Sequence, residues 1–283
     1  MRIAHASPEP ALRAFVERYW WCEGEAGDLP LLLPGTGAEL WIHYTGGVEP
    51  CPADGLPPRP LPAAHLVCLR QTRWSLTSRA AVGFVAVRFR AGALRHFLGP
   101  GVDDVADQVV SAADLWGPAG RRMTDEVRLA ADPGARTDVL DRFLTGLLDG
   151  HHRADAWMDA AVRLVYRSPG DLRMDALAER LGVGARRLQR AFPPAVGAGP
   201  KGFQRLARFQ KLTRALLLED QRRYLPAALG AGFYDQNHFI REFRHFTDQR
   251  PTALLGRGLS HFYYQPLRDP GQAGHRLGER EVR

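Results

Sequence analysis

Residues 228–251 read ALGAGFYDQNHFIREFRHFTDQRP, and residues 178–200 read AERLGVGARRLQRAFPPAVGAGP. The two stretches follow one pattern. The element Ala-x-x-x-Gly recurs after 50 residues, and the element Leu/Phe-x-Arg-x-Phe recurs after 51 residues. In the first stretch these elements are Ala178 to Gly182 and Leu188 to Phe192. A repeat of this length indicates one supersecondary unit that is used twice.

Each copy has the layout of a helix-turn-helix. The first copy predicts a short helix over 176–181, a tight turn at Gly182 to Gly184 and a second helix from Ala185 to about Phe192. Glycine suits the turn because the chain leaves the first helix in a left-handed conformation. Ala178 is small where the two helices must cross. We call the copies the first unit and the second unit, and the second helix of each its reading helix.

Both reading helices are predicted to bury an apolar pair and to expose polar side chains. Such a helix suits the major groove, where Arg pairs with guanine and Gln or Asn with adenine, so the two units should read different half-sites. Arg187 and Arg244 suit a phosphate as well as a base edge. The candidate DNA-binding residues are Arg186, Arg187, Gln189 and Arg190 in the first unit, and Asp235, Gln236, Asn237, His238, Arg241 and Arg244 in the second.

The segment between the units predicts one long helix. Its apolar residues recur every three or four positions, and basic residues lie between them. If this helix holds the readers about 34 Å apart, both enter successive major grooves on one face of the duplex. The apolar positions are Phe203, Leu206, Phe209, Leu212 and Leu216, and the basic positions are Arg205, Arg208, Lys211 and Arg214.

The charge is distributed unevenly along the 283 residues. The chain carries a net charge of +7, yet residues 1–156 carry −3 and residues 157–256 carry +8. A basic C-terminal half favours a polyanionic partner for that half alone.

The N-terminal half reads as strands followed by helices. Strands are expected at Glu39–Thr45, His65–Arg70 and Gly83–Arg90, with a proline-rich loop from Pro50 to Pro62 and helical patterns from Ala91 onward. We therefore predict an α+β protein. Residues 1–150 form a small β domain, cupin-like or related, with helices after it; residues 155–256 form an all-α DNA-binding domain; and residues 257–283 form a flexible tail.

No constellation of catalytic residues is recognisable, so no catalytic site, cofactor or metal is expected. His43 and His65 lack the partners of a metal cluster and are interpreted as lining the β domain or its surface. Cys22, Cys51 and Cys68 lack the spacing of a disulfide framework or a zinc site. No apolar stretch is long enough to span a bilayer and no secretory leader is evident, so we expect a cytoplasmic protein without a membrane partner.

Residues from about Leu172 to Leu255 resemble the DNA-binding region of the AraC/XylS family of bacterial transcription regulators. The resemblance lies in Gly232 to Arg244 followed by Pro251, and in Gly197 to Lys201 continuing through Arg208-Phe209. It implies that base contacts fall on the exposed positions of both reading helices: Arg186, Gln189, Arg190, Gln236, Asn237, His238 and Arg241. The N-terminal half is similar to a sensor domain of some members. The matching residues are Pro34-Gly35 leading to Glu39-Leu40, and Arg88 to Gly92.

Four positions depart from the family's pattern. Ala227 replaces a larger aliphatic residue, so the second unit should be less well packed. Gly184 stands where a capping serine is usual, so its reading helix lacks a side-chain cap. Pro226 is acceptable only in the first turn of its helix. Asp248 replaces a glycine and should adopt a left-handed conformation.

These observations predict a sequence-specific transcription regulator that binds double-stranded DNA. Its N-terminal half would bind a small-molecule effector or form a homodimer, and RNA polymerase would be a partner of an activator. One alternative is a regulator without a ligand, whose N-terminal half meets only protein. Another is a DNA-repair-type enzyme with a reactive cysteine, for which only Cys22, Cys51 or Cys68 is available.

Overall fold

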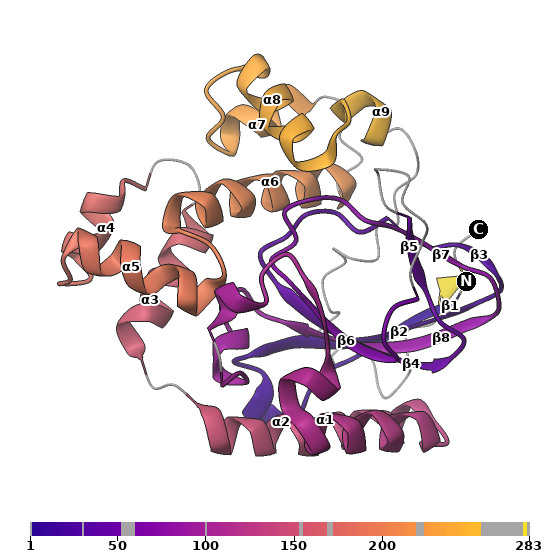
Figure 1. Cartoon of the computed structure of the whole chain (residues 1–283). Coiled ribbons are helices and arrows are strands. Elements are labelled where there is room, and N and C mark those ends of the chain that lie inside the picture. Colours follow the sequence, from indigo (N-terminus) through magenta and orange to yellow (C-terminus); the bar gives the residue numbers. More distant parts are fainter. Residues whose placement is uncertain are drawn as a thin grey trace.

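The computed structural model describes residues 2–29, 31–51, 60–99, 101–152, 155–168, 172–218, 224–255 and 280–281. Figure 1 shows a β domain with helices α1 (Ala112–Leu129) and α2 (Pro133–His151) below it. The helices of the C-terminal half lie at the left of the view and above the β domain. The structure confirms the predicted α+β class.

The larger sheet is antiparallel, with seven strands in the order β10-β1-β2-β8-β4-β6-β9. The three predicted strands are the adjacent members β8, β4 and β6 of this sheet. The long strand β2 was not predicted, because charged residues at its ends obscure the aromatic run Tyr19 to Trp21. The bounds are β1 Arg2–Ala6, β2 Val16–Gly24, β4 Ala38–Thr45, β6 Ala64–Cys68, β8 Val82–Phe89, β9 Val109–Ser111 and β10 Arg280–Glu281.

A smaller sheet has the order β3-β7-β5, formed by Gly27–Asp28, Ser75–Ser78 and Glu49–Cys51. Pro50 was predicted to begin a loop but pairs with Leu76 inside β5. Strand β5 lies at the edge of this sheet, where a residue without an N–H group is tolerated. Most of the predicted proline-rich loop, residues 52–59, lies outside the described residues.

One face of the larger sheet buries an aromatic cluster. The rings of Trp41 and Phe84 stack with centroids 4.4 Å apart, and Trp20 packs edge-on against both. At one end of this face, Glu39 is 1% exposed and receives hydrogen bonds from Arg88 and the Trp41 indole. A buried carboxylate is tolerable only with such partners.

The other face packs against α1 (Ala112–Leu129) and α2 (Pro133–His151). The Tyr19 hydroxyl donates to Asp141 over 2.6 Å, and the Arg136 guanidinium lies 3.8 Å from the centroid of the Tyr44 ring. The helical patterns predicted from Ala91 onward are confirmed in α1 and α2, but their first part, from Ala91 to Leu98, contains only a 3-10 turn, η2 (Leu94–His96), because Gly99-Pro100-Gly101 follows it in the sequence. Two further 3-10 turns are η1 (Pro10–Leu12) and η3 (Val102–Asp104).

The C-terminal half is helical throughout its described residues up to Leu255, as predicted. Its helices are α3 Ala156–Arg167, α4 Met174–Arg180, α5 Ala185–Val196, α6 Pro200–Leu218, α7 Tyr224–Gly230, α8 Gln236–Thr247 and α9 Pro251–Leu255. Most of the tail predicted over residues 257–283 lies outside the described residues, and its residues Arg280–Glu281 pair with β1 as β10.

Candidate nucleic-acid interface

The repeat seen in the sequence is a repeat of backbone geometry. In the first unit, Gly182 has a φ of +63° and the Val183 N–H donates to the Ala178 carbonyl over 3.0 Å. In the second unit, Gly232 has a φ of +87° and Phe233 donates to Ala228 over 3.1 Å. Both units therefore close the first helix with the same left-handed turn.

The apolar pair predicted for each reading helix is buried in α5 and in α8, and we call these four residues the anchors. Leu188 and Phe192 are 0% exposed, and their counterparts Phe239 and Phe243 are 1% and 0% exposed. The rings of Phe192 and Phe243 pack against two aromatic residues of α6, Phe203 and Phe209, at centroid distances of 5.7 and 5.5 Å. The long central helix α6 therefore packs against the reading helices of both units.

The polar candidates lie on the opposite side of these anchors. Nine of the ten are exposed, and His238 is half-buried. The exposed nine are Arg186, Arg187, Gln189, Arg190, Asp235, Gln236, Asn237, Arg241 and Arg244. Both units thus present the side chains that a groove-reading surface needs.

Two of the candidates also have structural roles. The carboxylate of Asp235 caps α8 by accepting from the His238 N–H over 2.6 Å. The Arg187 guanidinium lies 5.1 Å from the centroid of the Trp157 ring on α3, so this side chain packs against protein. Both residues remain exposed.

A backbone hydrogen bond defines which nitrogen of the His238 imidazole can donate. Its Nδ1 accepts a hydrogen bond from the Tyr234 N–H over 3.2 Å, so Nδ1 carries a lone pair and the neutral ring holds its proton on Nε2. A donor at Nε2 matches acceptors such as N7 and O6 of guanine or O4 of thymine, and not the amino group of cytosine. The sequence predicted His238 as a contact but not this polarity.

The basic residues of α6 tie the helices together. Arg205 forms two hydrogen bonds with Glu242 of α8, over 2.9 and 2.7 Å. Arg208 donates to the Gly232 carbonyl in the second turn, and Lys211 donates to the Arg167 carbonyl at the end of α3. Burial alone would raise the pKa of the Glu242 carboxyl, but the hydrogen bonds and charge of Arg205 outweigh it and lower that pKa. The sequence showed these cations but not that they are internal ties.

The departures noted at the helix ends have defined structural outcomes. Gly184 is the N-cap of α5 and offers no side-chain hydrogen bond, and Asp248 ends α8 with a φ of +55°, as predicted. Pro226 lies in the first turn of α7. The reading helix α5 runs past Phe192 to Val196 and includes Pro193 and Pro194, where a shorter helix was predicted.

The central helix α6 has 19 residues, which correspond to a length of about 28 Å. Figure 1 shows the first unit near one end of α6 and the second unit along its upper side. The spacing of the two reading helices along DNA stays a prediction.

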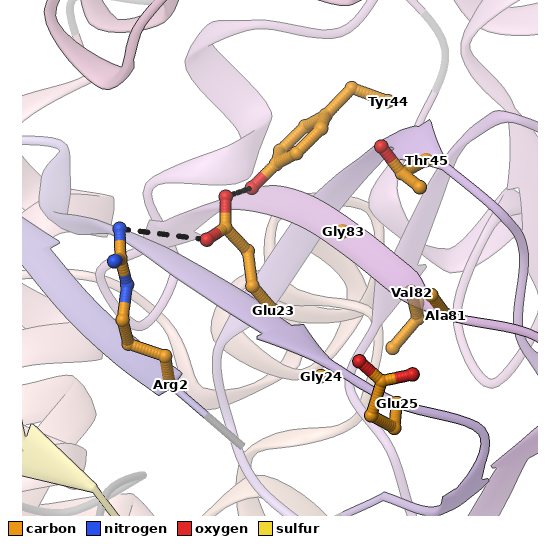
Figure 2. A pocket seen from close by; sticks show the side chains of 9 residues that line it. All are labelled: Arg2, Glu23, Gly24, Glu25, Tyr44, Thr45, Ala81, Val82 and Gly83. Carbon is orange, nitrogen blue, oxygen red and sulfur yellow. Dashed lines mark hydrogen bonds and ion pairs between the residues drawn. The ribbon is translucent and has the colours of Figure 1, made fainter.

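The β domain has a shallow hollow at one end of strands β1, β2, β8 and β4 of the larger sheet (Figure 2). Its lining includes Arg2, Glu23, Glu25, Tyr44 and Gly83. The Glu23 carboxylate already accepts from the Tyr44 hydroxyl over 2.8 Å and lies 3.6 Å from the Arg2 guanidinium. Because Glu23 is engaged by its neighbours, the hollow does not point to a particular ligand.

The two histidines considered for metal binding lie inside the β domain. His43 and His65 are 3% and 1% exposed, and their rings stack with centroids 5.4 Å apart. Burial lowers the pKa of His43 to about 3 and that of His65 to about 4, so both rings are neutral near pH 7. Within the described residues, no group of three or more His, Cys, Asp or Glu side chains is arranged to hold a metal ion.

Cys22 and Cys68 are buried thiols. Burial raises the pKa of each to about 12, which suppresses the thiolate that a nucleophilic cysteine requires. The side chain of Cys51 lies outside the described residues. The alternative of a cysteine enzyme gains no support from Cys22 or Cys68.

Among the helices of the described segments, none is both long and apolar enough to cross a bilayer.

Residues 177–257 match the family described as a helix-turn-helix domain, and this family is of the AraC type. The C-terminal region is an AraC-type helix-turn-helix domain. Residues 4–111 match a domain of unknown function. A comparison with curated proteins gave no match.

Several solved structures are similar to the chain. ToxT from Vibrio cholerae is 11% identical with a TM-score of 0.48, and the match covers 90% of this chain and 97% of that one. ToxT in a form described as bound to an unsaturated fatty acid is 14% identical, with a TM-score of 0.46 and coverage of 83% and 94%. The AraC-like transcriptional activator CuxR is 14% identical, with a TM-score of 0.24 and coverage of 75% and 86%. At these identities and scores, the likenesses carry no inference about what this chain binds.

Proposed function

We propose that this protein is a sequence-specific transcription regulator whose reading helices α5 and α8 enter successive major grooves of double-stranded DNA. The observation that carries the proposal is the repeated turn geometry, with buried anchors on one side of each reading helix and exposed Arg, Gln and Asn side chains on the other. The charge of +8 on residues 157–256 favours a polyanionic partner.

The residues divide by their chemistry. Arg190 and Arg241 occupy equivalent positions of the repeat and suit the N7 and O6 atoms of guanine. Gln236 and Asn237, at the start of α8, suit adenine. Arg187 is held near Trp157 and suits the phosphate backbone better than a base.

The test begins with selection of bound sites from genomic fragments by the full chain. Arg190→Ala and Arg241→Ala should each cost about 1–3 kcal/mol at a selected site and relax base preference at one position. Arg121→Ala, which removes an exposed arginine of α1, is the matched control and should leave binding unchanged. Unchanged selectivity in both reading-helix variants would remove α5 and α8 from base recognition.

Salt dependence tests the charge argument separately. Because phosphate contacts release counterions, the affinity for a selected duplex should fall steeply between low and moderate salt. A flat dependence would show that the basic C-terminal half does not contact the DNA backbone.

We also propose that the β domain controls the presentation of the reading helices. Polar contacts of the β domain reach both α6 and α8. Gln210 of α6 accepts from the Thr36 N–H over 2.9 Å and from its hydroxyl over 2.7 Å, and Arg73 donates to the Thr247 carbonyl at the end of α8 over 2.6 Å. A ligand or second copy that favours one state of the β domain would act on α6 and α8 through these contacts.

Thermal shift of the full chain against a metabolite panel tests for an effector. A ligand at about 100 times its dissociation constant adds about 2.7 kcal/mol to the stability of the folded state. A ligand found this way should change DNA affinity in the native chain and change it less in Gln210→Ala. If no metabolite shifts the melting temperature, the ligand-free alternative is favoured, and sedimentation then tests for a homodimer. RNA polymerase is the further partner to test if the bound genes are activated.

A further inference from the structure

The two turns differ in length by one residue, and that residue is Tyr234. Val183 and Phe233 make the same hydrogen bond back to the preceding helix, at an offset of 50 residues, whereas the N-caps Gly184 and Asp235 are offset by 51. Tyr234 therefore has no counterpart in the first unit. Its side chain is 88% exposed, although the preceding residue, Phe233, is 4% exposed.

The backbone that carries Tyr234 is held on several sides. The Tyr234 N–H donates to His238 Nδ1 over 3.2 Å, and Asp235 caps the helix that begins with the next residue. Arg208 of α6 donates to the Gly232 carbonyl over 2.9 Å. The exposed ring thus projects from an ordered turn fixed to the reading helix and to α6.

The position of Tyr234 suits the edge of a groove. In a helix-turn-helix, the N-terminal residues of the reading helix contact base edges, so the residue before the N-cap lies close to the sugar-phosphate backbone. A tyrosine there offers a hydroxyl donor for a phosphate oxygen. The exposed Asp235, Gln236 and Asn237 follow directly in the chain, so the ring extends the reading surface of α8 without a break.

We propose that Tyr234 is an additional DNA-contact residue, whose hydroxyl donates to a phosphate at the edge of the groove that α8 enters. This inference rests on the proposed function. The contact adds affinity to the second unit alone and carries no base preference, because a phosphate is common to every sequence.

Tyr234→Phe tests the hydroxyl while it keeps the ring. The probes are a duplex selected by the native chain and a duplex of random sequence. Tyr234→Phe should weaken binding to both by about tenfold, the lower end of what a hydrogen bond to a charged group contributes. The slope of affinity against salt should not change, because phenol carries no charge to release a counterion.

Leu129→Ala, which removes another highly exposed apolar side chain, on α1 of the β domain, is the matched control and should bind as the native chain does. Equal melting temperatures of Tyr234→Phe and the native chain show that the turn is intact. Binding of Tyr234→Phe within twofold of native overturns the proposal, and so does a loss confined to the selected duplex. Arg241→Ala is measured in parallel: if it loses selectivity while Tyr234→Phe binds normally, this inference fails and the proposed function stands.

Discussion

The two helix-turn-helix units share one backbone pattern but are held in place differently. The first unit packs against the β domain: a Cβ atom added to Gly197, at the end of α5, would lie 3.1 Å from the Ala106 methyl group and 3.3 Å from Val102. The second unit meets the β domain where Arg73 donates to the Thr247 carbonyl, and it is also held by side-chain hydrogen bonds: Asp235 accepts from its own reading helix, and Arg205 of α6 donates to Glu242.

The reading helices differ in their backbone hydrogen bonds, because α5 contains two prolines and α8 contains none. Pro193 and Pro194 lack an N–H, so the Gln189 and Arg190 carbonyls in α5 lose their helical donors. Helix α8 contains no proline and has a side-chain cap. The comparison teaches that one fold can rely mainly on side-chain hydrogen bonds within the helical region in one copy and mainly on packing against a neighbouring domain in the other.

The largest effect should come from the anchors. Phe243→Ala and Phe192→Ala each remove a fully buried ring, which should lower the free energy of unfolding by about 3–5 kcal/mol. Denaturant unfolding of the full chain measures both. A much smaller loss for Phe192→Ala would mean that contacts with the β domain compensate for the lost ring, and would sharpen the difference between the units.

The next effect concerns the ion pair of the second unit. Glu242→Gln should cost about 1–2 kcal/mol at pH 7, because it weakens charge-assisted hydrogen bonds from Arg205. Since folding lowers the pKa of Glu242, its stabilisation is complete above the unfolded value near 4.5 and is lost as the pH falls through the folded value. The difference between native chain and variant should therefore shrink on acidification.

Urea unfolding at pH 7 and in mild acid measures this difference. Glu126→Gln, which alters an exposed ion pair with Arg142, is the matched control and should have almost no effect. A pH-independent difference for Glu242→Gln would contradict the role of its charge.

A smaller effect should follow from loss of the cap on α8. Asp235→Ala should destabilise the protein by about 1 kcal/mol, whereas Asp235→Asn should retain most of the stability because its side chain also accepts from the helix N-terminus. Thermal melting compares the two variants. Equal losses in both would show that the carboxylate acts by its charge and not as a cap.

The smallest effect should come from restoring a cap to α5. A Cβ at Gly184 meets no atom within 4 Å and the residue has a φ of −69°, so serine fits. Gly184→Ser should raise stability by a few tenths of a kcal/mol, and Gly184→Ala should not. Precise calorimetry is needed. A destabilising Gly184→Ser would show that the N-terminus of α5 needs no local acceptor.

The sequence predicted the repeated unit well because its determinants are local. A glycine in a left-handed turn, a small alanine at the crossing and an apolar pair four residues apart each leave a pattern in consecutive residues. Strand β2 was missed because strand pairing depends on neighbours in space. A helix was predicted from Ala91 where only the 3-10 turn η2 forms, because a nearby Gly-Pro-Gly segment ends the helical pattern.

The roles of the cations on α6 were not predictable for a similar reason. Arg205, Arg208 and Lys211 have the spacing of an exposed basic face, yet their partners lie 24 to 44 residues away in sequence. Periodicity shows which positions share a face of a helix but not which other element covers that face.

The sequence by itself determined two helix-turn-helix units, their apolar anchors and the polar residues opposite them, because helical periodicity and turn chemistry act over a few residues. Only the tertiary structure decided that Gln210 binds Thr36, that Arg73 binds Thr247 and that the rings of His43 and His65 are enclosed. Those contacts join residues far apart in the chain, and only packing of the whole fold brings them within hydrogen-bond distance or excludes water from them.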